Sequence, residues 1–361
     1  MAMAKHGGAV FREAAAAGIS PREIIDFSAN INPLGLPRGV LSEMRRALEN
    51  LGHYPEIDGE SLVRLLARRH QLEPDHVIVG NGSTALIYLL ARVLRPARAL
   101  LWVPAFSEYE RALRQNGSQV FYLTSWESGR PLPLPELAAA SRQAQPDLVF
   151  ICNPNNPTGQ LLDPQQLESM LSEWEKTGII VVLDEAFIDF AGPEFSLAAS
   201  VKRFSNLIIL RSLTKIYALA GVRCGYLLSA PALSGRLRAL LEPWSLNSIA
   251  LAAAVRALSD RSDFLRRSRE LIEKERDFLL TELKKIPGLE VYPSRANYLL
   301  TKIEGEPESA SISRRLFAEE RILIRICDDY VGLNRDYLRF AVRGREDNRR
   351  LVRGLGSCLG R

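Results

Sequence analysis

A lysine next to small hydroxyl side chains is the feature of this sequence with the clearest chemical potential. Lys215 ends the stretch RSLTK (residues 211–215), and Arg223 follows eight residues later. Apolar residues come directly after the lysine, so burial should lower the pKa of its ammonium group and free an amine that can condense with a carbonyl. The hydroxyls of Ser212 and Thr214 and the guanidinium of Arg223 could bind a phosphate beside that amine.

An amine beside a phosphate site suggests pyridoxal 5'-phosphate as the cofactor. The alternative is that Lys215 is an ordinary surface lysine, as most lysines are. The stretch alone leaves both interpretations open.

A carboxylate ends another apolar run. Asp184 directly follows residues 179–183, which are typical of a buried strand. A carboxylate at the rim of such a strand is costly unless it meets a cation. The protonated pyridine nitrogen of pyridoxal phosphate would be such a cation, and keeping it protonated preserves the ring as an electron sink. The alternative role for Asp184 is to cap the next helix.

A glycine-rich stretch at residues 80–85 supports a competing hypothesis. The sequence GNGSTA follows a predicted strand and opens a predicted helix, which is a loose form of the dinucleotide-binding fingerprint. A Rossmann site also requires an acidic residue at the end of the next strand, but that strand ends in Trp102-Val103-Pro104. We therefore expect the backbone N–H groups of Ser83 and Thr84 to bind a single phosphate.

The stretch NPNNPTG at residues 153–159 follows a third predicted strand, 148–152. Proline and glycine explain it as a tight turn without any chemistry. However, ligands of open α/β sheets collect at the carboxyl ends of strands, so this stretch is also a candidate binding loop.

The elements that would position these residues alternate between strand and helix. The pattern predicts an α/β domain with a mainly parallel sheet, followed by a small α+β domain. We predict an N-terminal segment at 1–44, a large domain at 45–250 and a small domain at 251–361. Predicted strands are 77–79, 99–103, 148–152, 179–183, 207–210, 226–228, 289–292, 297–301, 322–326 and 337–342, and predicted helices are 39–50, 61–70, 85–93, 263–285, 309–320 and 345–355.

Composition narrows the function classes. The net charge of +5 is spread along 361 residues without a basic block, which favours small anionic ligands over nucleic acid. The four cysteines lack the paired spacing of a metal site or a disulfide framework, so we expect no metal and a reducing, cytoplasmic setting. Neither a secretory signal nor a membrane span is expected.

Asn156, Asp184, Lys215 and Arg223, in this order and at these spacings, resemble fold-type I pyridoxal-phosphate enzymes of the aminotransferase class. A closer resemblance, over nearly the whole chain, is to the L-threonine-O-3-phosphate decarboxylases of cobalamin biosynthesis. The stretches that carry it are 6–8, 26–35, 54–55, 184–190, 211–215, 243–245, 295–300 and 322–325.

This resemblance implies roles for individual side chains around the cofactor. Lys215 would bind pyridoxal phosphate covalently, Asp184 would pair with the pyridine nitrogen, Asn156 would bind the ring hydroxyl and Phe106 would stack on the ring. The phosphate would be held by Ser83, Thr84, Ser212, Thr214 and Arg223, with Tyr54 reaching in from the second subunit of a homodimer.

The resemblance also implies a substrate with two anionic ends, a phosphorylated amino acid. Arg339 and Asn156 would bind its α-carboxylate. Arg325 would bind its phosphate together with His6 and the loop Asn30-Ile31-Asn32, and the N-terminal segment would close over the site as a lid. From the residues alone, surface ion pairing is the alternative for both arginines.

The expected reaction is decarboxylation of L-threonine O-3-phosphate to (R)-1-amino-2-propanol O-2-phosphate and CO2. Histidinol-phosphate aminotransferase is the alternative, and a nucleotide-binding dehydrogenase or regulatory module is a remote one. The histidinol-phosphate group usually has a tyrosine where this chain has Phe187, and the decarboxylases resemble this chain at that position.

Overall fold

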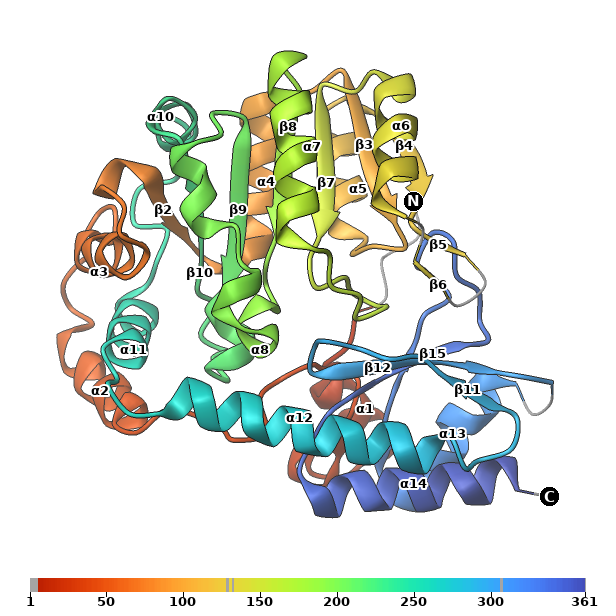
Figure 1. Ribbon diagram of the computed structural model, residues 1–361. Coiled ribbons are helices and arrows are strands. Elements are labelled where there is room, and N and C mark those ends of the chain that lie inside the picture. Colours follow the sequence, from red (N-terminus) through yellow and green to blue (C-terminus); the bar gives the residue numbers. More distant parts are fainter. Residues whose placement is uncertain (1–5, 128–129, 132, 306–307, 361) are drawn as a thin grey trace.

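The computed structural model describes residues 6–127, 130–131, 133–305 and 308–360. Its largest element is a seven-stranded sheet with the strand order β2-β10-β9-β8-β7-β3-β4 (Figure 1). The strands are β2 (Val77–Gly80), β3 (Arg98–Val103), β4 (Gln119–Thr124), β7 (Leu148–Cys152), β8 (Ile180–Asp184), β9 (Leu207–Ser212) and β10 (Gly225–Ser229).

Strand direction decides where the functional residues collect. Strands β4, β3, β7, β8 and β9 pair in parallel, whereas β10 is antiparallel to both β9 and β2. Gly225 at the start of β10 therefore pairs with Ser212 at the end of β9 and with Gly80 at the end of β2. All the motifs that follow a predicted strand thus emerge at one edge of the sheet.

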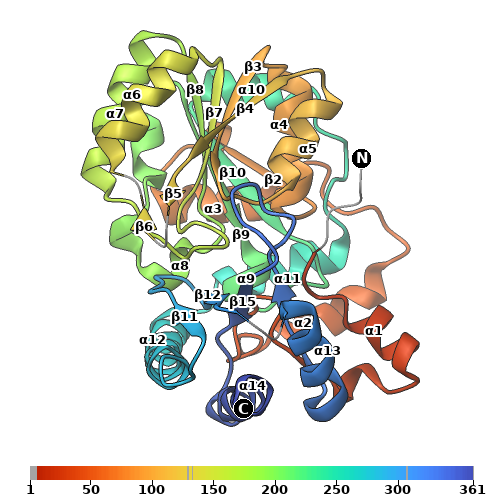
Figure 2. The same cartoon turned by 90° about the vertical axis from the view of Figure 1, so that its right-hand side faces the viewer.

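Helices cover both faces of this sheet (Figure 2). Alternate strand residues enter two separate hydrophobic cores, as expected for strands buried on both sides. The helices on the one face are α4 (Gly82–Leu94), α5 (Glu108–Gln115) and α10 (Pro231–Arg238), and those packed in the core of the other face include α3 (Glu60–His70), α6 (Leu134–Ala144), α7 (Pro164–Lys176) and α11 (Ser248–Leu258).

A second, antiparallel sheet has the strand order β11-β12-β15-β14. In Figure 1 it lies below the large sheet, with helices beneath it. The strands are β11 (Leu289–Val291), β12 (Tyr298–Ile303), β14 (Arg325–Ile326) and β15 (Tyr337–Ala341), and the helices are α12 (Phe264–Leu283), α13 (Ser309–Glu320) and α14 (Arg345–Leu359).

The predicted single strand 322–326 is wrong, because the structure divides it into two. β13 (Ile322–Leu323) pairs in parallel with β1 (Ile25–Asp26), while β14 pairs with β15 in the small sheet. The N-terminal segment, which also contains α1 (Val10–Ala17), is thereby tied to residues about 300 positions away. The division at residues 44 and 250 stays a prediction.

Other predicted elements differ mainly at their ends. Strand β4 is not among the predicted strands, because its sequence QVFYLT mixes polar and apolar residues; of the six, Val120 alone is buried. The predicted helix 39–50 is α2 (Val40–Ala47) continued by a 3-10 turn, η2 (Leu48–Asn50). The remaining short elements are η1 (Pro21–Glu23), η3 (Pro74–His76), β5 (Trp126–Glu127), β6 (Arg130–Pro131), α8 (Ile188–Ala191), η4 (Pro193–Phe195), η5 (Ala198–Lys202) and α9 (Leu213–Ile216).

Within the described residues, no helix combines the length and apolarity needed to cross a membrane.

Candidate active site

Two adjoining cavities lie where the carboxyl ends of the parallel strands face the small sheet. We call them the outer cavity, of about 390 Å³, and the inner cavity, of about 90 Å³. Cavities of about 410 and 610 Å³ lie elsewhere, but no lysine lines either of them in the part of the chain that is described. Six residues line both the outer and the inner cavity: Thr84, Phe106, Asn156, Phe187, Lys215 and Arg223.

Lys215 lies at the junction of the two cavities. It is carried by α9, the single helical turn that follows β9. The pKa of its ammonium group is lowered to about 8, chiefly by burial and also by the nearby positive charges of Arg339 and Arg223, while Asp184 opposes the shift. The ring of Phe187 lies 5.8 Å from Nζ. The amine is therefore largely available as a nucleophile at mildly alkaline pH.

Asp184 forms the floor of the inner cavity at the end of β8. Its Oδ1 accepts a hydrogen bond from the Ala186 N–H at 2.9 Å, and its Oδ2 accepts one from the Tyr109 hydroxyl at 2.5 Å. Burial raises the pKa of this carboxyl group, and the bond from Tyr109 acts in the opposite direction. A ligand cation in the inner cavity would offset the cost of burying this carboxylate.

Donors for a phosphate converge at the other side of the inner cavity. Ser212 Oγ and Thr214 Oγ1 lie 2.7 Å apart, and both side chains are buried. Helix α4 begins at Gly82 instead of the predicted residue 85, so Ser83 and Thr84 lie in its first turn. Backbone N–H groups in a first turn have no partner within the helix, which makes this end an anion-binding site.

Two glycines allow these donors to approach one another. A Cβ atom on Gly82, whose φ is +79°, would lie 2.7 Å from Arg223 Nη2. A Cβ atom on Gly225 would lie 2.4 Å from the backbone nitrogen of Ser83. Any larger residue at either position would push apart the helix start, β10 and the arginine.

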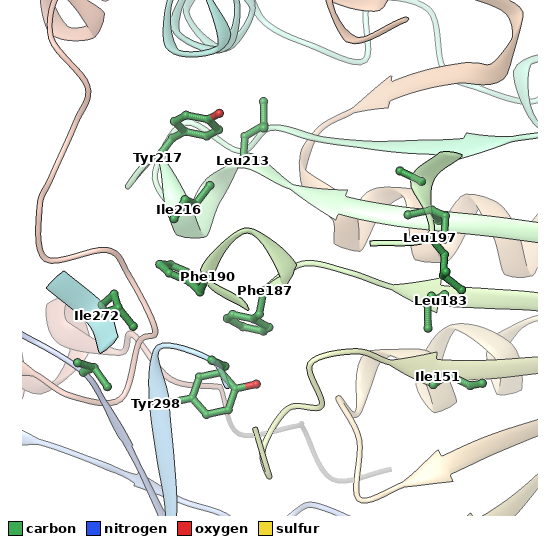
Figure 3. Packing of buried hydrophobic residues seen from close by; sticks show 14 of the residues in the cluster. Ile151, Leu183, Phe187, Phe190, Leu197, Leu213, Ile216, Tyr217, Ile272 and Tyr298 are labelled. Atoms are coloured by element: carbon green, nitrogen blue, oxygen red, sulfur yellow. The ribbon is translucent and has the colours of Figure 1, made fainter. Parts of the chain in front are cut away.

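Aromatic rings border the inner cavity. The ring of Phe106 packs edge-on against Tyr109, with ring centroids 5.8 Å apart. The ring of Phe187 packs edge-on against Tyr298 of β12 at 5.1 Å, and Figure 3 shows these two rings side by side between the two sheets. Phe106 and Phe187 both line the cavity, so a flat ligand ring could bind between apolar walls.

Arg339 and Asn156 meet in the outer cavity, although one belongs to β15 and the other to the turn after β7. Arg339 Nη1 donates a hydrogen bond to Asn156 Oδ1, and its Nη2 donates one to the Ser28 carbonyl at 2.8 Å. Its Nε is buried without a hydrogen-bond partner among the described residues. The guanidinium is thus held in place with one N–H group still available.

Arg325 lines the same cavity from β14. Its Nη2 donates a hydrogen bond to Asp329 Oδ1 at 2.5 Å, and its Nη1 donates one to the Ile326 carbonyl at 2.5 Å. The guanidinium carbon lies 5.3 Å from the centroid of the Tyr330 ring. These contacts fix the orientation of the guanidinium.

The N-terminal segment covers part of the outer cavity. His6 Nε2 lies 2.9 Å from Glu108 Oε1 at the start of α5. Gly8 N–H donates a hydrogen bond to Ser28 Oγ at 2.8 Å, and a Cβ atom on Gly7 would lie 2.0 Å from the Ser28 carbonyl oxygen. The segment therefore lies close against the loop after β1 and extends from there to the large sheet's helices.

Three predicted site residues do not line these cavities. Asn32 donates its side-chain amide to the Ile216 carbonyl at 2.7 Å and to Ser268, so it supports the turn that carries Lys215. Ile31 is its neighbour and lines neither cavity. Tyr54 is 82% exposed and packs on Trp244, so it contributes nothing to the site of its own chain. Asn30 does line the outer cavity, and its Oδ1 is buried without a partner among the described residues.

Several lining residues were not predicted: Tyr109, Glu108 and Tyr330, together with Ser28. Phe106 precedes α5, which begins at Glu108, so helical spacing does not relate Tyr109 to it. For the other residues, no local signal in the sequence distinguishes them from surface positions.

The turn at 153–159 serves both structure and binding. Asn155 Oδ1 accepts hydrogen bonds from the backbone and the hydroxyl of Thr158, and Asn155 Nδ2 donates to the Pro104 carbonyl. Asn156, by contrast, faces both cavities. Asn155 therefore stabilises the tight turn, while its neighbour Asn156 is available to bind a ligand.

The lining of the inner cavity matches pyridoxal 5'-phosphate group by group. Lys215 offers an amine for the aldehyde and Asp184 a buried carboxylate for the ring nitrogen. The helix start, the two hydroxyls and Arg223 offer donors for the phosphate, and Gly82 and Gly225 leave room for them to converge. The residues present therefore fit this cofactor.

Comparison with known proteins gives concordant matches. Residues 22–355 match the family model for aminotransferase class I and II. The chain is 39% identical to a threonine-phosphate decarboxylase of Salmonella typhimurium, over 98% of this chain and 96% of that one. Two solved structures are similar: a histidinol-phosphate aminotransferase from Clostridium acetobutylicum (30% identity, TM-score 0.85, covering 92% of this chain and 98% of that one) and an L-threonine-O-3-phosphate decarboxylase from Porphyromonas gingivalis (27%, 0.83, 93% and 99%).

Proposed function

The chain belongs to the class I and II aminotransferase family of fold-type I pyridoxal-phosphate enzymes, and within it we propose that the protein decarboxylates L-threonine O-3-phosphate. The products are (R)-1-amino-2-propanol O-2-phosphate, a precursor for the aminopropanol arm of cobalamin, and CO2. Family membership sets aside the remote alternative of a nucleotide-binding dehydrogenase or regulatory module.

The observation that carries the proposal is the pair of buried arginines beside Lys215. Arg325 and Arg339 line one cavity together with the lysine, and both are at least 94% buried. A pocket with two arginines and a nucleophilic amine suits a substrate that has an amino group and two anionic groups. Threonine phosphate has this composition, and the decarboxylase relative at 39% identity supports the choice.

The α-carboxylate of the substrate binds to Arg339 with help from Asn156. Arg339 is held by Asn156 and by the Ser28 carbonyl, and its Nε provides the remaining donor. Because these groups fix the carboxylate, they also decide which bond at Cα points away from the plane of the cofactor ring. Substrate binding thereby selects the bond that breaks.

The phosphate of the substrate binds to Arg325 and His6. His6 belongs to the N-terminal segment, which lies over the outer cavity. Contact with the phosphate would hold that segment closed and exclude water from the reacting carbon. Asn30, from the same loop as Ser28, adds a buried polar group to this wall.

Pyridoxal phosphate supplies an electron sink for the pair released when the bond between Cα and the carboxylate breaks. Asp184, assisted by Tyr109, would keep a positive charge on the ring nitrogen, and Ser83, Thr84, Ser212, Thr214 and Arg223 would hold the cofactor phosphate. After CO2 leaves, Cα must gain one proton. Lys215, with a pKa of about 8 in the protein, is the donor we assign to this step.

Phe187 distinguishes this proposal from transamination. Its ring lies beside the lysine and carries no hydroxyl group, whereas a tyrosine there could donate a hydrogen bond to the cofactor oxygen. Histidinol-phosphate aminotransferase is the second candidate, because an enzyme of that name has a similar structure at 30% identity.

We also propose that the protein acts as a homodimer, with Tyr54 contributing to the site of the partner. Exposed apolar side chains gather along residues 36–57 and 240–244, and Trp244 N–H donates a hydrogen bond to the Ile57 carbonyl at 2.9 Å between these segments. Such a surface is typical of a subunit interface.

The decisive experiment is incubation of the holoenzyme with L-threonine O-3-phosphate and no oxo acid. We expect stoichiometric CO2 and aminopropanol phosphate. Turnover of histidinol phosphate only when 2-oxoglutarate is added, with no CO2 from threonine phosphate, would instead identify the aminotransferase.

A further inference from the structure

We propose that Tyr330 sets the spacing between the two anion-binding arginines and thereby selects the length of the substrate. The inference rests on the proposed function, because it takes Arg325 and Arg339 as the groups that bind phosphate and carboxylate. It adds a positioning residue that the motifs of the sequence did not indicate.

The register of the small sheet brings two positively charged side chains close together. Arg325 and Arg339 are direct partners across the antiparallel pair β14 and β15. Side chains at such positions point to the same face with Cβ atoms about 4.5–5.5 Å apart, and like charges there repel. Both guanidinium groups are also buried, so water screens their repulsion poorly, and the carboxylate of Asp329 offsets part of the charge of Arg325.

Tyr330 contacts both guanidinium groups with different parts of its side chain. The carbon of the Arg325 guanidinium lies 5.3 Å from the centroid of the Tyr330 ring, within the range of a cation–π contact. The Tyr330 hydroxyl lies 3.3 Å from Arg339 Nη1, from which it accepts, and 3.3 Å from Asn156 Oδ1, to which it donates. The two arginines therefore contact different ends of one rigid side chain, the ring and the hydroxyl group.

The position of Tyr330 is itself fixed by packing. The side chain is buried in a small cluster with Trp126, Tyr292, Leu300 and Cys327. Hydrogen bonds from Tyr330 N–H to the Cys327 carbonyl and from Leu333 N–H to the Tyr330 carbonyl close the loop around it. A rigid spacer of this kind keeps a constant distance between the arginines, whether or not a ligand is bound.

A fixed spacing gives length selection. A substrate can satisfy both arginines only if its carboxylate and phosphate are separated by the matching number of bonds. O-phospho-L-homoserine has one methylene more between these groups than O-phospho-L-threonine has along the same path. The site should therefore disfavour it, and the preference should depend on the Tyr330 ring.

Two variants separate the ring from the hydroxyl. Tyr330→Phe keeps the ring against Arg325 but removes the hydrogen bonds to Arg339 and Asn156, and Tyr330→Leu removes both contacts. Tyr337→Phe is the matched control, because this tyrosine packs on Tyr292 in the same region without lining either cavity.

The readout is the Kd of the holoenzyme for four ligands, including O-phospho-L-homoserine, followed by absorbance of the bound cofactor. L-threonine carries only the carboxylate, 1-amino-2-propanol O-2-phosphate only the phosphate, and O-phospho-L-threonine both. We expect Tyr330→Phe to weaken L-threonine about tenfold, as for a hydrogen bond to a charged group, and to leave the phosphate-only ligand unchanged. Tyr330→Leu should weaken both, and should reduce the preference for O-phospho-L-threonine over O-phospho-L-homoserine at least about threefold.

An equal loss for all ligands in both variants, or no loss in either, would overturn the inference. If a thermal unfolding assay shows that Tyr330→Leu is not folded, the ligand selectivity of Tyr330→Phe still tests the inference. The proposed reaction is tested separately by the wild type: ligand-selective binding without CO2 release would refute the reaction and leave the spacer role intact.

Discussion

The phenol of Tyr109 donates a 2.5 Å hydrogen bond to Oδ2 of Asp184, and both side chains are buried. Tyr109 is held in turn by stacking on Phe150, with ring centroids 4.7 Å apart. Since burial raises the pKa of Asp184 and this bond lowers it, Tyr109 favours the anionic form of the carboxylate. The charge of the carboxylate that we propose as the partner of the cofactor ring thus depends on a residue of α5.

Tyr109→Phe should reduce kcat/KM roughly ten- to a hundredfold, the range for a lost hydrogen bond to a charged group. The pKa of Asp184 would rise further, so the deficit should be largest at low pH and shrink as pH increases. Tyr122→Phe, which removes a hydroxyl bonded to Glu110 at the surface, is the control. A deficit that does not vary with pH would contradict this role.

Lys215 should make the stability of the cofactor-free protein depend on pH. Its pKa is about 8 in the folded chain and 10.5 in the unfolded chain, so between these values the unfolded state binds more protons. Stability contributed by this position therefore rises from pH 8 to pH 10.5. Lys215→Met should abolish that rise in chemical unfolding curves, while Lys202→Met, at an exposed position, should preserve it.

The same lysine has a chemical test. Lys215→Ala should abolish turnover and the borohydride-reducible adduct with pyridoxal phosphate, because no other lysine lines the two cavities in the part of the chain described. Normal turnover by this variant, or an adduct mapped to another lysine, would refute the assignment.

Gly82→Ala should weaken binding of pyridoxal phosphate through a steric clash with Arg223. Gly82 and Gly117 both have positive φ, +79° and +85°, but only at Gly82 would the new Cβ meet a side chain. Both substitutions should therefore lower stability by about 1–2 kcal/mol for the backbone conformation. Only Gly82→Ala should raise the Kd for the cofactor. An equal rise in Gly117→Ala would argue against a phosphate site between the start of α4 and Arg223.

Arg325→Gln should raise the KM for threonine phosphate at least about thirtyfold, since removing one partner of a buried charge pair typically costs about 2–5 kcal/mol. Binding of L-threonine, which has no phosphate, should change little. Arg335→Gln is the control, because that side chain is exposed and paired with Glu308 at 3.2 Å. Unchanged KM in Arg325→Gln would assign the phosphate to another group.

Placing a charge on the proposed dimer surface should dissociate the protein and lower its activity. Leu48 and Leu51 are 51% and 58% exposed, so Leu48→Asp and Leu51→Asp do not disturb the core. Phe11→Asp, on α1, is a control with an apolar residue that is even more exposed, at 79%. Sedimentation velocity should show monomers only for the first two variants, and a monomeric wild type would refute the dimer.

The site residues that could be predicted from the sequence share one position, at or near the end of a buried strand. Asp184, Ser212 and Lys215 come at or just after the ends of buried apolar runs, and the carboxyl ends of parallel strands meet at one edge of the sheet. Apolar runs alone predict six strands of the large sheet. The direction of one of them, β10, does not follow from its apolar run, because β10 is antiparallel to both of its neighbours.

Contacts between distant segments decide the features that sequence could not predict. Tyr109 meets Asp184 across 75 positions, and Glu108 meets His6 across 102. The division of 322–326 into β13 and β14 likewise depends on β1, which supplies a partner strand from the other end of the chain. No local pattern carries these relations, because each is decided by packing of the finished fold.

The bond from Arg339 to the Ser28 carbonyl spans 311 positions of the chain. During synthesis on the ribosome, Ser28 therefore waits for almost the entire polypeptide before Arg339 exists. β1 has its own partner strand only once residues 322 and 323 have emerged. A nascent chain interrupted anywhere before that point could build much of the large sheet, but it would lack the wall of the outer cavity that Arg325, Tyr330 and Arg339 supply.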